Sequence, residues 1–517
     1  MAVREIFLLL ALCISSSYGI LRFANYFQDN MVLQRAPQRA VVWGYGDAKA
    51  RTTLTLNKKV YHTISRDEPA NKLGESIWSV TLDAETDEGP FEVIVTQPVA
   101  NGSLATISLN NVLYGDVWLC SGQSNMQMTV IDIFNASTEI ANAANYPKIR
   151  VFTAALRESS SPVEELLGIV QRWSVASPSS IGGPSYQYTS AVCWLYGRMI
   201  HVALNNRPIG LIATSWGGTP IEFWMPPPAL QECGIRKKKR IPFESYGQPN
   251  FQRLTVTNSE LYNSMIYPFT RMVITGAIWY QGESNAYKNR DKYSCMFSKM
   301  IQYWRQVWNT RTNGITDLNF PFGFVQLSTN ERSGNVVGGF PWIRWYQTFG
   351  VGHVPNNVIP NVFMAAAMDL RDDDGNIHPR TKEDVGYRLS RAGLAVFYKQ
   401  NVEYLGPIIS NAVVTSGSTN IDITYTSVTG IELRNGNGFE VCCRGAANCA
   451  NDNQWFAAPA SLKGGLTITL TVPNSCVSQT IYGFRYLWRE TPCLFKQAAV
   501  YSATDSNLPS PPYLKIF

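Results

Sequence analysis

The stretch GDVWLCSGQSNMQM, residues 115–128, marks a change in the pattern of apolar residues along the chain. Its first part, DVWLCSG, is a short and nearly continuous apolar run, which is typical of a strand buried on both faces. Gly122 then permits a tight strand-to-helix turn, which would present the hydroxyl of Ser124 beside a helix N-terminus. In parallel α/β sheets, reactive groups gather where strands end, so this stretch predicts both a fold class and a place for a site.

Downstream of this stretch, strand-like runs alternate with helical runs as far as residue 400. Five further buried strands are predicted, at residues 148–154, 209–218, 276–284, 321–328 and 361–370. Apolar residues at helical spacing predict helices over residues 191–206, 291–309 and 384–400. The alternation predicts an α/β layer with a mostly parallel sheet, which we assign to residues 112–400.

The flanks of this region read as β structure. At 517 residues the chain is too long for one compact core, so two or three domains are expected. Residues 20–111 hold short alternating runs separated by Gly, Pro, Asp and Asn, which predict a small β-sandwich or barrel. Strands without helices return after residue 400 and predict a second β region at 401–517.

The N-terminus and the cysteines indicate the secretory pathway. Residues 1–19, MAVREIFLLLALCISSSYG, predict a signal peptide, and its apolar core is too short to span a bilayer. Removing it leaves nine cysteines, an odd number, and several of them crowd the C-terminal part, where we expect disulfides whose pairing the sequence does not give. Asn101 and Asn135 are the predicted N-glycosylation sites. We expect a protein of the lysosomal lumen or the extracellular space.

The charge of the chain limits its partners. A formal net charge of +6 is small for this length and gives no case for nucleic-acid binding. One basic run, RKKKR at residues 236–240, is either a solvated loop or a processing site for a basic-specific protease. The sequence does not choose between these two interpretations.

Two serines compete for the role of nucleophile, because residues 122–125 (GQSN) and 282–285 (GESN) are near-copies that both follow a predicted strand. Ser124 comes after a glycine turn at a helix N-terminus, where free backbone N–H groups favour a developing oxyanion. Ser284 has Glu283 as its neighbour, and a carboxylate is unfavourable next to an emerging negative charge. The residues therefore favour Ser124 without excluding Ser284.

A serine nucleophile needs a base, and only four histidines are present. His378 follows the predicted strand 361–370, in the segment DLRDDDGNIHPR, where aspartates stand ready to orient an imidazole. His62 lies in the N-terminal β region, His201 in a helical run and His353 in a Gly/Asn loop. The aspartate run also reads as an acidic turn or a cation site, although it lacks the ligand spacing and final Glu of an EF-hand.

The order of these motifs resembles that of the sialate O-acetylesterase family of SGNH (GDSL-like) hydrolases. The resemblance covers nearly the whole chain and rests on several separate sequence motifs: MVLQRAP, VVWGYG, GDVWLCSGQSNMQM, IGLIATSWGGTPIE, WYQGESN, PFGFVQLS, IHPR and FRYLW. It implies a flavodoxin-like SGNH three-layer core with flanking β-sandwich-like domains, and removal of O-acetyl groups, chiefly 9-O-acetyl, from sialic acids.

The resemblance also implies roles for residues. Ser124 is the expected nucleophile and His378 the base, and the Ser124 N–H, the Gly218 N–H and the side-chain amide of Gln281 or Asn285 are expected to form the oxyanion hole. Many SGNH enzymes carry an acid two or three residues before the histidine, where this chain has Asn376 and Gly375. Asp374 is therefore the first choice for the orienting acid, Asp369 is the second, and a Ser-His dyad remains open.

The resemblance implies neither metal nor organic cofactor, an O-acetylated sialic acid or sialoglycan as substrate, and no insertion into a membrane. We also expect Arg371 or Arg380 to hold the sialic acid carboxylate, and Trp216 or Trp279 either to stack on the sugar or to pack against the sheet. Two alternatives stay open at the level of sequence. One is an acetylesterase for xylan or another acetylated glycan, and the other is a secreted glycan-binding glycoprotein with a vestigial esterase site.

Overall fold

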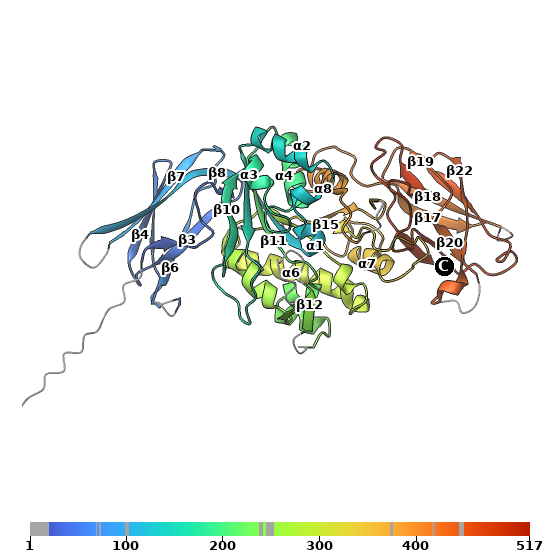
Figure 1. Ribbon diagram of the computed structural model, residues 1–517, viewed down its shortest axis with the longest axis horizontal. Helices are drawn as coiled ribbons and strands as arrows, with labels where there is room; N and C mark the ends of the chain where they lie inside the picture. The colour runs from blue at the N-terminus through green and yellow to red at the C-terminus, as the bar shows by residue number, and fades with distance from the viewer. Residues whose placement is uncertain are drawn as a thin grey trace, which may run out of the picture.

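Three parts follow one another along the long axis of the computed structural model: an N-terminal β part, a central α/β part and a C-terminal β part (Figure 1). The structure describes residues 20–68, 70–71, 74–98, 103–236, 241–244, 253–372, 376–415, 417, 419–443 and 449–517. The predicted signal peptide, Asn101, Asp374 and most of the basic run 236–240 lie outside these residues.

The central sheet has the strand order β10-β9-β11-β8-β14-β15-β16. Its strands are β8 (Leu104–Gly122), β9 (Ile149–Ala154), β10 (Ile169–Val175), β11 (Ile209–Ser215), β14 (Gly276–Tyr280), β15 (Phe322–Gln326) and β16 (Val362–Ala366). All neighbouring pairs are parallel except β10 with β9. This confirms the predicted mixed α/β fold with a mostly parallel sheet.

Helices cover both faces of this sheet, with α2, α3, α4 and α8 on one side and α6 and α7 on the other (Figure 1). The three long helices match the predicted ranges to within a few residues: α4 (Ala191–Ala203), α6 (Tyr293–Arg311), which ends two residues later than predicted, and α8 (Lys382–Val396), which begins two residues earlier. The shorter ones are α1 (Ser124–Gln127), α2 (Ala136–Asn142), α3 (Pro178–Ile181), α5 (Pro227–Glu232) and α7 (Phe340–Gln347). The buried apolar residues of the central layers and of the N-terminal part form one continuous core.

Strand β8 joins the N-terminal and central parts. Its first half pairs with β7, its middle pairs with β2, and its last residues lie between β11 and β14. The strand is 19 residues long and continues through residue 111, where we placed a domain boundary. One continuous strand therefore belongs to both the N-terminal and the central sheet. It ends at Gly122, the first residue of the GQSN loop.

The flanking parts are built from short strands. The N-terminal strands are β1 (Arg22–Phe23), β2 (Val32–Gln34), β3 (Val41–Gly46), β4 (Arg51–Leu56), β5 (Lys59–Ile64), β6 (Ser76–Thr81) and β7 (Phe91–Pro98). A hairpin of β12 (Ile241–Glu244) and β13 (Arg253–Val256) projects from the central part. The C-terminal strands are β17 (Ile408–Val414), β18 (Asn420–Thr426), β19 (Ile431–Leu433), β20 (Phe439–Cys442), β21 (Trp455–Ala457), β22 (Ala460–Gly464), β23 (Thr467–Thr471), β24 (Gly483–Tyr486), β25 (Val500–Ser502) and β26 (Tyr513–Ile516). This C-terminal part has its own apolar core, which fits the expected β-rich region.

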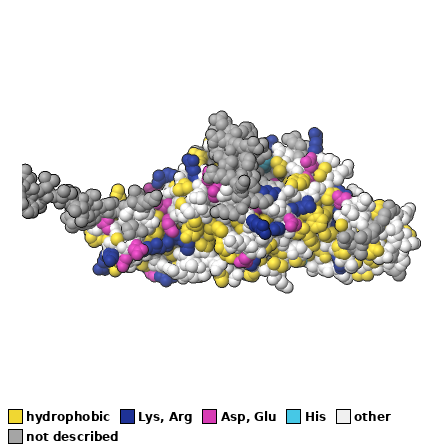
Figure 2. Space-filling model, turned by 90° about the horizontal axis from the view of Figure 1, so that it is seen from below, with side chains coloured by type: hydrophobic (Ala, Val, Ile, Leu, Met, Phe, Trp, Pro, Cys, Tyr) yellow, Lys and Arg dark blue, Asp and Glu magenta, His cyan; other side chains and the backbone are white. Residues whose placement is uncertain are grey.

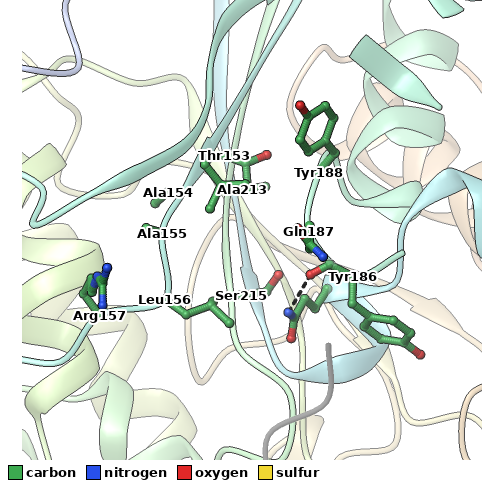
Figure 3. Close-up of a pocket in the computed structure, with 12 residues that line it drawn as sticks. Thr153, Ala154, Ala155, Leu156, Arg157, Tyr186, Gln187, Tyr188, Ala213 and Ser215 are labelled. Atoms are coloured by element: carbon green, nitrogen blue, oxygen red, sulfur yellow. Dashed lines mark hydrogen bonds between the residues drawn. The ribbon is translucent and has the colours of Figure 1, made fainter. Parts of the chain in front are cut away.

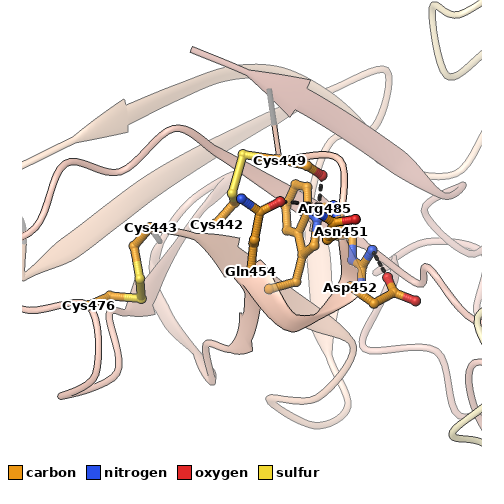
Figure 4. The surroundings of a disulfide bond; sticks show 9 residues. Cys442, Cys443, Cys449, Asn451, Asp452, Gln454, Cys476 and Arg485 are labelled. Carbon is orange, nitrogen blue, oxygen red and sulfur yellow. Dashed lines mark hydrogen bonds and ion pairs between the residues drawn. A yellow bond between two sulfur atoms is a disulfide. The ribbon is translucent and has the colours of Figure 1, made fainter. Parts of the chain in front are cut away.

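Four disulfides link cysteines that the sequence left unpaired. Two of them, Cys442–Cys449 and Cys443–Cys476, fasten the C-terminal part (Figure 4). The other two join elements of the central part, Cys120 on β8 with Cys193 on α4, and Cys233 with Cys295. Cys493 is the remaining thiol among the described residues, and burial raises its pKa far above the ordinary value.

The surface fits the modest net charge. On the face shown in Figure 2, basic and acidic side chains are interspersed with apolar ones. Within the described ranges, no helix has the length and apolar character needed to cross a bilayer.

Candidate active site

Three loops meet at the carboxyl edge of the central sheet, because the ends of β11, β8 and β14 lie in register. Gly122 pairs with Ser215 on one side and with Tyr280 on the other. The loop after β11 is then drawn toward the loop after β8, since the Trp216 N–H donates to the Gly122 carbonyl at 3.0 Å. The order of the strands therefore brings the GQSN, SWGGT and GESN motifs together at one place.

The turn before Ser124 requires glycine. Gly122 has a φ of 143°, and a Cβ at this position would lie 2.1 Å from the carbonyl oxygen of Tyr280. Ser124 is the first residue of α1, where the backbone N–H groups have no partner within the helix itself. The turn thus presents the hydroxyl of Ser124 at the N-terminus of α1.

The structure brings Ser124 and His378 together although 254 positions separate them in the chain. The Nε2 atom of His378 lies 2.7 Å from the Oγ atom of Ser124. Burial, and after it the positive charge of Lys382, lowers the pKa of His378 to about 4. The imidazole is therefore neutral at neutral pH and can accept the serine proton, which is the arrangement that nucleophilic catalysis by serine requires.

The side chain of Asn125 ties the histidine loop to the serine loop. Its Nδ2 atom donates to the carbonyl of Ile377 at 2.9 Å, and its Oδ1 atom accepts from Nζ of Lys382 at 2.8 Å. The same ammonium donates to the carbonyl of Pro379. Both neighbours of His378 are thereby linked to the residue that follows Ser124, and we call this arrangement the asparagine clamp.

Two buried charges complete the asparagine clamp. Glu283 accepts from Nδ2 of Asn125 at 2.7 Å, and burial raises the pKa of this carboxyl. Lys382 is only 1% exposed, and burial lowers its pKa to about 7 against the opposing effect of the Glu283 and Asp372 carboxylates. Glu283 thus takes part in the site through Asn125. From the sequence, Glu283 was considered only as an unfavourable neighbour of Ser284.

The amides of Gln281 and Asn285, one of which we expect at the oxyanion hole, are engaged in hydrogen bonds within the protein. The Gln281 amide donates to the carbonyl of Thr219 and to Oδ1 of Asn285, and the Asn285 amide donates to Glu222 and to the carbonyl of Lys288. Both amides are fully buried and use both of their hydrogens in these contacts. Their function is to hold the loop after β11, because Oδ1 of Asn285 also accepts from the N–H of Ile221.

Gly218 lies in the loop that this amide network holds. It has a φ of 75°, and the N–H of its neighbour Gly217 donates to Oε1 of Gln127 on α1 at 2.7 Å. The bond fixes the SWGGT loop against the helix that carries Ser124. The residues on both sides of Gly218 are thereby held, Gly217 by the helix of Ser124 and Thr219 by the amide of Gln281.

The identity of the acid that orients His378 stays a prediction. Asp374, our first choice, lies outside the described residues. Asp369, our second choice, is engaged elsewhere: its carboxylate pairs with Arg388 at 2.6 and 2.9 Å and accepts from the hydroxyl of Tyr501. We therefore do not retain Asp369 in this role.

A cavity of about 270 Å³ opens beside the Ser-His pair, at the ends of β9 and β11 (Figure 3). Tyr186 connects the two, since its ring meets the His378 ring edge-on with centroids 6.2 Å apart. Gln127 also lines the cavity and belongs to α1, the helix of Ser124. The cavity thus has the position of a substrate pocket.

The tryptophans and arginines that we expected to contact the substrate are buried or bonded to other parts of the protein. Trp216 and Trp279 are buried, and Trp279 packs between Trp224 and Trp304, so the packing interpretation is correct for it. The guanidinium of Arg380 lies over the ring of Phe134 and donates to a backbone carbonyl. Arg371 donates to the carbonyl of Asp372. Neither arginine lines the cavity.

The remaining predictions are placed as follows. The Nδ1 atom of His201 lies 2.6 Å from the carbonyl oxygen of Arg207 and His62 contacts Thr53, so both are engaged away from Ser124. Asn135 is exposed and open to glycosylation, which stays a prediction. Sequence reasoning missed Asn125 and Lys382. The repeated Ser-Asn pair of the two loops was a signal for Asn125, whereas Lys382 begins a helix among charged residues and reads as solvated.

Comparison with known proteins adds the following findings. Residues 114–394 match the domain family described as carbohydrate esterase, sialic acid-specific acetylesterase, and residues 410–517 match the sialate O-acetylesterase C-terminal domain. The chain is 40% identical to mouse sialate O-acetylesterase, over 99% of this chain and 97% of that protein. It is 39% identical to the human sialate O-acetylesterase, over 95% and 92%. A carbohydrate acetylesterase from Xanthomonas citri has a similar structure, with a TM-score of 0.76 and 25% identity over 96% of this chain and 99% of that one.

Proposed function

Because the chain belongs to the sialate O-acetylesterase family, we propose that it releases acetate from 9-O-acetylated sialic acids through a serine–histidine acyl-enzyme mechanism. The chain is a carboxylic-ester hydrolase, a sialate O-acetylesterase. The observation that carries the mechanism is the distance of 2.7 Å between Oγ of Ser124 and Nε2 of His378.

The first half of the reaction transfers the acetyl group to the enzyme. Oγ of Ser124 attacks the ester carbonyl while Nε2 of His378 accepts the serine proton. The tetrahedral intermediate then collapses, and the sugar oxygen leaves as an alcohol after taking the proton from His378. In the second half a water molecule gives its proton to the same imidazole and attacks the acetyl-serine, which releases acetate and restores the hydroxyl.

The oxyanion of the tetrahedral intermediate needs donors that are fixed before the reaction. We assign this role to the backbone N–H groups of Ser124 and Gly218. The support is that Ser124 opens α1 and that the SWGGT loop is bonded to Gln127 of the same helix. The buried amides of Gln281 and Asn285 act indirectly, because they keep this loop in place.

The topology supports assignment of the central part to the flavodoxin-like SGNH class. We number five strands 1 to 5 along the chain: β8, β11, β14, β15 and β16. Their spatial order in the sheet is then 2-1-3-4-5, and β9 and β10 are added at the β11 edge. In that order the strand sequence reverses between the first and third strands, which is where α/β proteins bind ligands. These are β8 and β14, the two strands that carry the GQSN and GESN loops.

Four disulfides fit a protein of the secretory pathway, where the oxidising environment keeps such bonds. We propose the lysosomal lumen or the extracellular space as its location. A base whose pKa is lowered to about 4 would stay neutral in a mildly acidic lumen as well as outside the cell.

The decisive experiment measures acetate release from 9-O-acetylated sialic acid by mass spectrometry, with acetylated xylo-oligosaccharide as the competing substrate. The wild-type protein is expected to release acetate from the sialic acid at the higher kcat/KM, and His378→Ala should lower this value by about a thousandfold. A preference for the xylo-oligosaccharide would transfer the activity to another glycan. Near-normal turnover by folded His378→Ala would end the proposed mechanism.

A further inference from the structure

The cavity beside the catalytic pair is lined almost entirely by uncharged groups. Its lining includes Thr153, Tyr186, Gln187, Tyr188 and Ser215, whose polar atoms suit the hydroxyl groups of a sugar (Figure 3). Among the described residues that line the cavity, Arg157 alone carries a formal charge. One cation in a neutral polar pocket is a strong discriminator between charged and uncharged ligands.

The backbone of Arg157 is fixed while its guanidinium is uncommitted. The hydroxyl of Ser264 donates to the Arg157 carbonyl at 2.5 Å, which anchors the loop after β9 to the segment before β14. The side chain is exposed, and no carboxylate of the described ranges lies within ion-pair distance of it. Arg271 and Arg311 differ from Arg157 in this respect, because both are paired with Glu164. Arg157 is therefore available to a ligand.

The geometry of the cavity matches the shape of the expected substrate. A 9-O-acetyl group stands at the end of the glycerol tail on C6 of sialic acid, and the carboxylate is on C2, which is joined to C6 through the ring oxygen, so the length of the tail separates the two groups. In the protein, Tyr186 adjoins His378 at one side of the cavity, and Arg157 stands on the side away from Tyr186 (Figure 3). A substrate whose acetyl group reaches Ser124 would thus direct its carboxylate toward Arg157.

We propose that this cavity is the subsite for the sugar ring and carboxylate of sialic acid, and that Arg157 determines specificity by pairing with that carboxylate. The inference rests on the proposed function and adds the residue that selects an anionic sugar. A guanidinium is suited to this role because it binds a carboxylate through two parallel hydrogen bonds. It replaces Arg371 and Arg380 as the expected partners, since both are engaged outside the cavity.

The test compares substrates that differ in a single charge. The 9-O-acetylated methyl glycoside of sialic acid is assayed beside its neutral methyl ester, and 4-nitrophenyl acetate reports the chemistry alone. Arg157→Gln is expected to lower kcat/KM for the carboxylate substrate by about tenfold to a hundredfold, mainly through KM. The same variant should leave turnover of the methyl ester and of 4-nitrophenyl acetate unchanged.

Two matched variants sharpen the result. Arg172→Gln removes another exposed arginine, from β10 outside the cavity lining, and is expected to behave as wild type with all three substrates. Arg157→Lys keeps the charge and loses the paired geometry, so it should recover part of the loss. Added salt should reduce the advantage of the carboxylate substrate for the wild type and have no such effect on Arg157→Gln.

The outcomes separate this inference from the proposed function. If the wild type releases acetate from the carboxylate substrate and Arg157→Gln equals it with every substrate, Arg157 does not read the carboxylate and the inference fails alone. An equal loss with all three substrates would also overturn it, because the residue would then act on folding or on the chemical step. If His378→Ala stays active, the proposed function fails whatever Arg157 does.

Discussion

Residues 122–125 and 282–285 differ by one residue, occupy the ends of neighbouring parallel strands and perform different tasks. In the first loop Ser124 faces the imidazole of His378, and Asn125 holds the histidine loop. In the second loop the N–H of Ser284 donates to Oε1 of Gln123, and Asn285 holds the loop after β11. Each asparagine thus fastens a different neighbouring loop to the sheet edge.

The single difference, Gln123 against Glu283, links the loops to each other. Gln123 accepts from the backbone of the second loop, and Glu283 accepts from the amide of Asn125 in the first. Nearly the same four residues therefore carry the proposed nucleophile in one place and a structural support in the other. What decides the task is the segment that lies opposite: the histidine loop for one, the SWGGT loop for the other.

The largest effect should come from removing the two hydroxyls in turn. Ser124→Ala is expected to lower kcat for acetate release by at least about a thousandfold, because it removes the attacking atom. Ser284→Ala should change kcat little, since the contact of Ser284 with Gln123 is made by its backbone. Labelling by a fluorophosphonate probe gives a second readout. Loss of labelling in Ser284→Ala with retention in Ser124→Ala would reverse the assignment.

Replacing each asparagine by alanine in turn should show that the catalytic effect belongs to Asn125. Asn125→Ala breaks the asparagine clamp and is expected to lower kcat by about tenfold to a hundredfold, with KM nearly unchanged, because the serine–histidine geometry is loosened. Asn285→Ala leaves the buried carboxylate of Glu222 with one partner fewer and should lower the free energy of unfolding by about 1–3 kcal/mol. Kinetics and urea unfolding of both variants provide the comparison. Identical profiles for the two variants would contradict it.

Substitution of the two loop glycines should also have unequal effects on stability, with the larger effect in the first loop. Both have positive φ, but a Cβ at Gly122 would meet the backbone oxygen of Tyr280 at 2.1 Å, whereas one at Gly282 would meet a side-chain methyl of Ile343 at 2.7 Å. Gly122→Ala is therefore expected to cost more stability than Gly282→Ala, with a difference of roughly 1–3 kcal/mol in the free energy of unfolding. Thermal unfolding measured side by side checks the order.

The smallest effect is a shift in pH dependence. Activity needs neutral His378, so kcat/KM should fall on acidification through the pKa of about 4. Lys382, with a pKa of about 7, is positively charged in that range, and it lowers the pKa of the imidazole. Lys382→Met should therefore raise the pKa of His378 and move the acid limb of the kcat/KM profile to higher pH. An unmoved limb with a lower plateau would leave Lys382 a purely structural role.

The sequence predicted those features that depend on local pattern. The buried strands and the three long helices follow from apolar periodicity, and Ser124 and His378 follow from the motifs around them. The clamp was not predictable, because Lys382 stands beside Glu383 and Asp384 in a typical solvated helix start and becomes buried only through tertiary contacts. Arg157 lies in a polar loop whose position over the cavity depends on contacts with residues about a hundred positions away. The hydrogen bonds of the Gln281 and Asn285 amides were not predictable either, because the sequence does not show which groups accept their hydrogens.

Strand β8 has a consequence for any attempt to shorten the protein. The same backbone that closes the N-terminal sheet passes into the middle of the central sheet and stops at Gly122. Trimming the chain before residue 104 would expose an unpaired strand edge that runs directly into the nucleophile turn. The N-terminal part is thus no detachable module. An esterase reduced to its central and C-terminal parts should aggregate or lose its turnover, rather than work as a minimal enzyme.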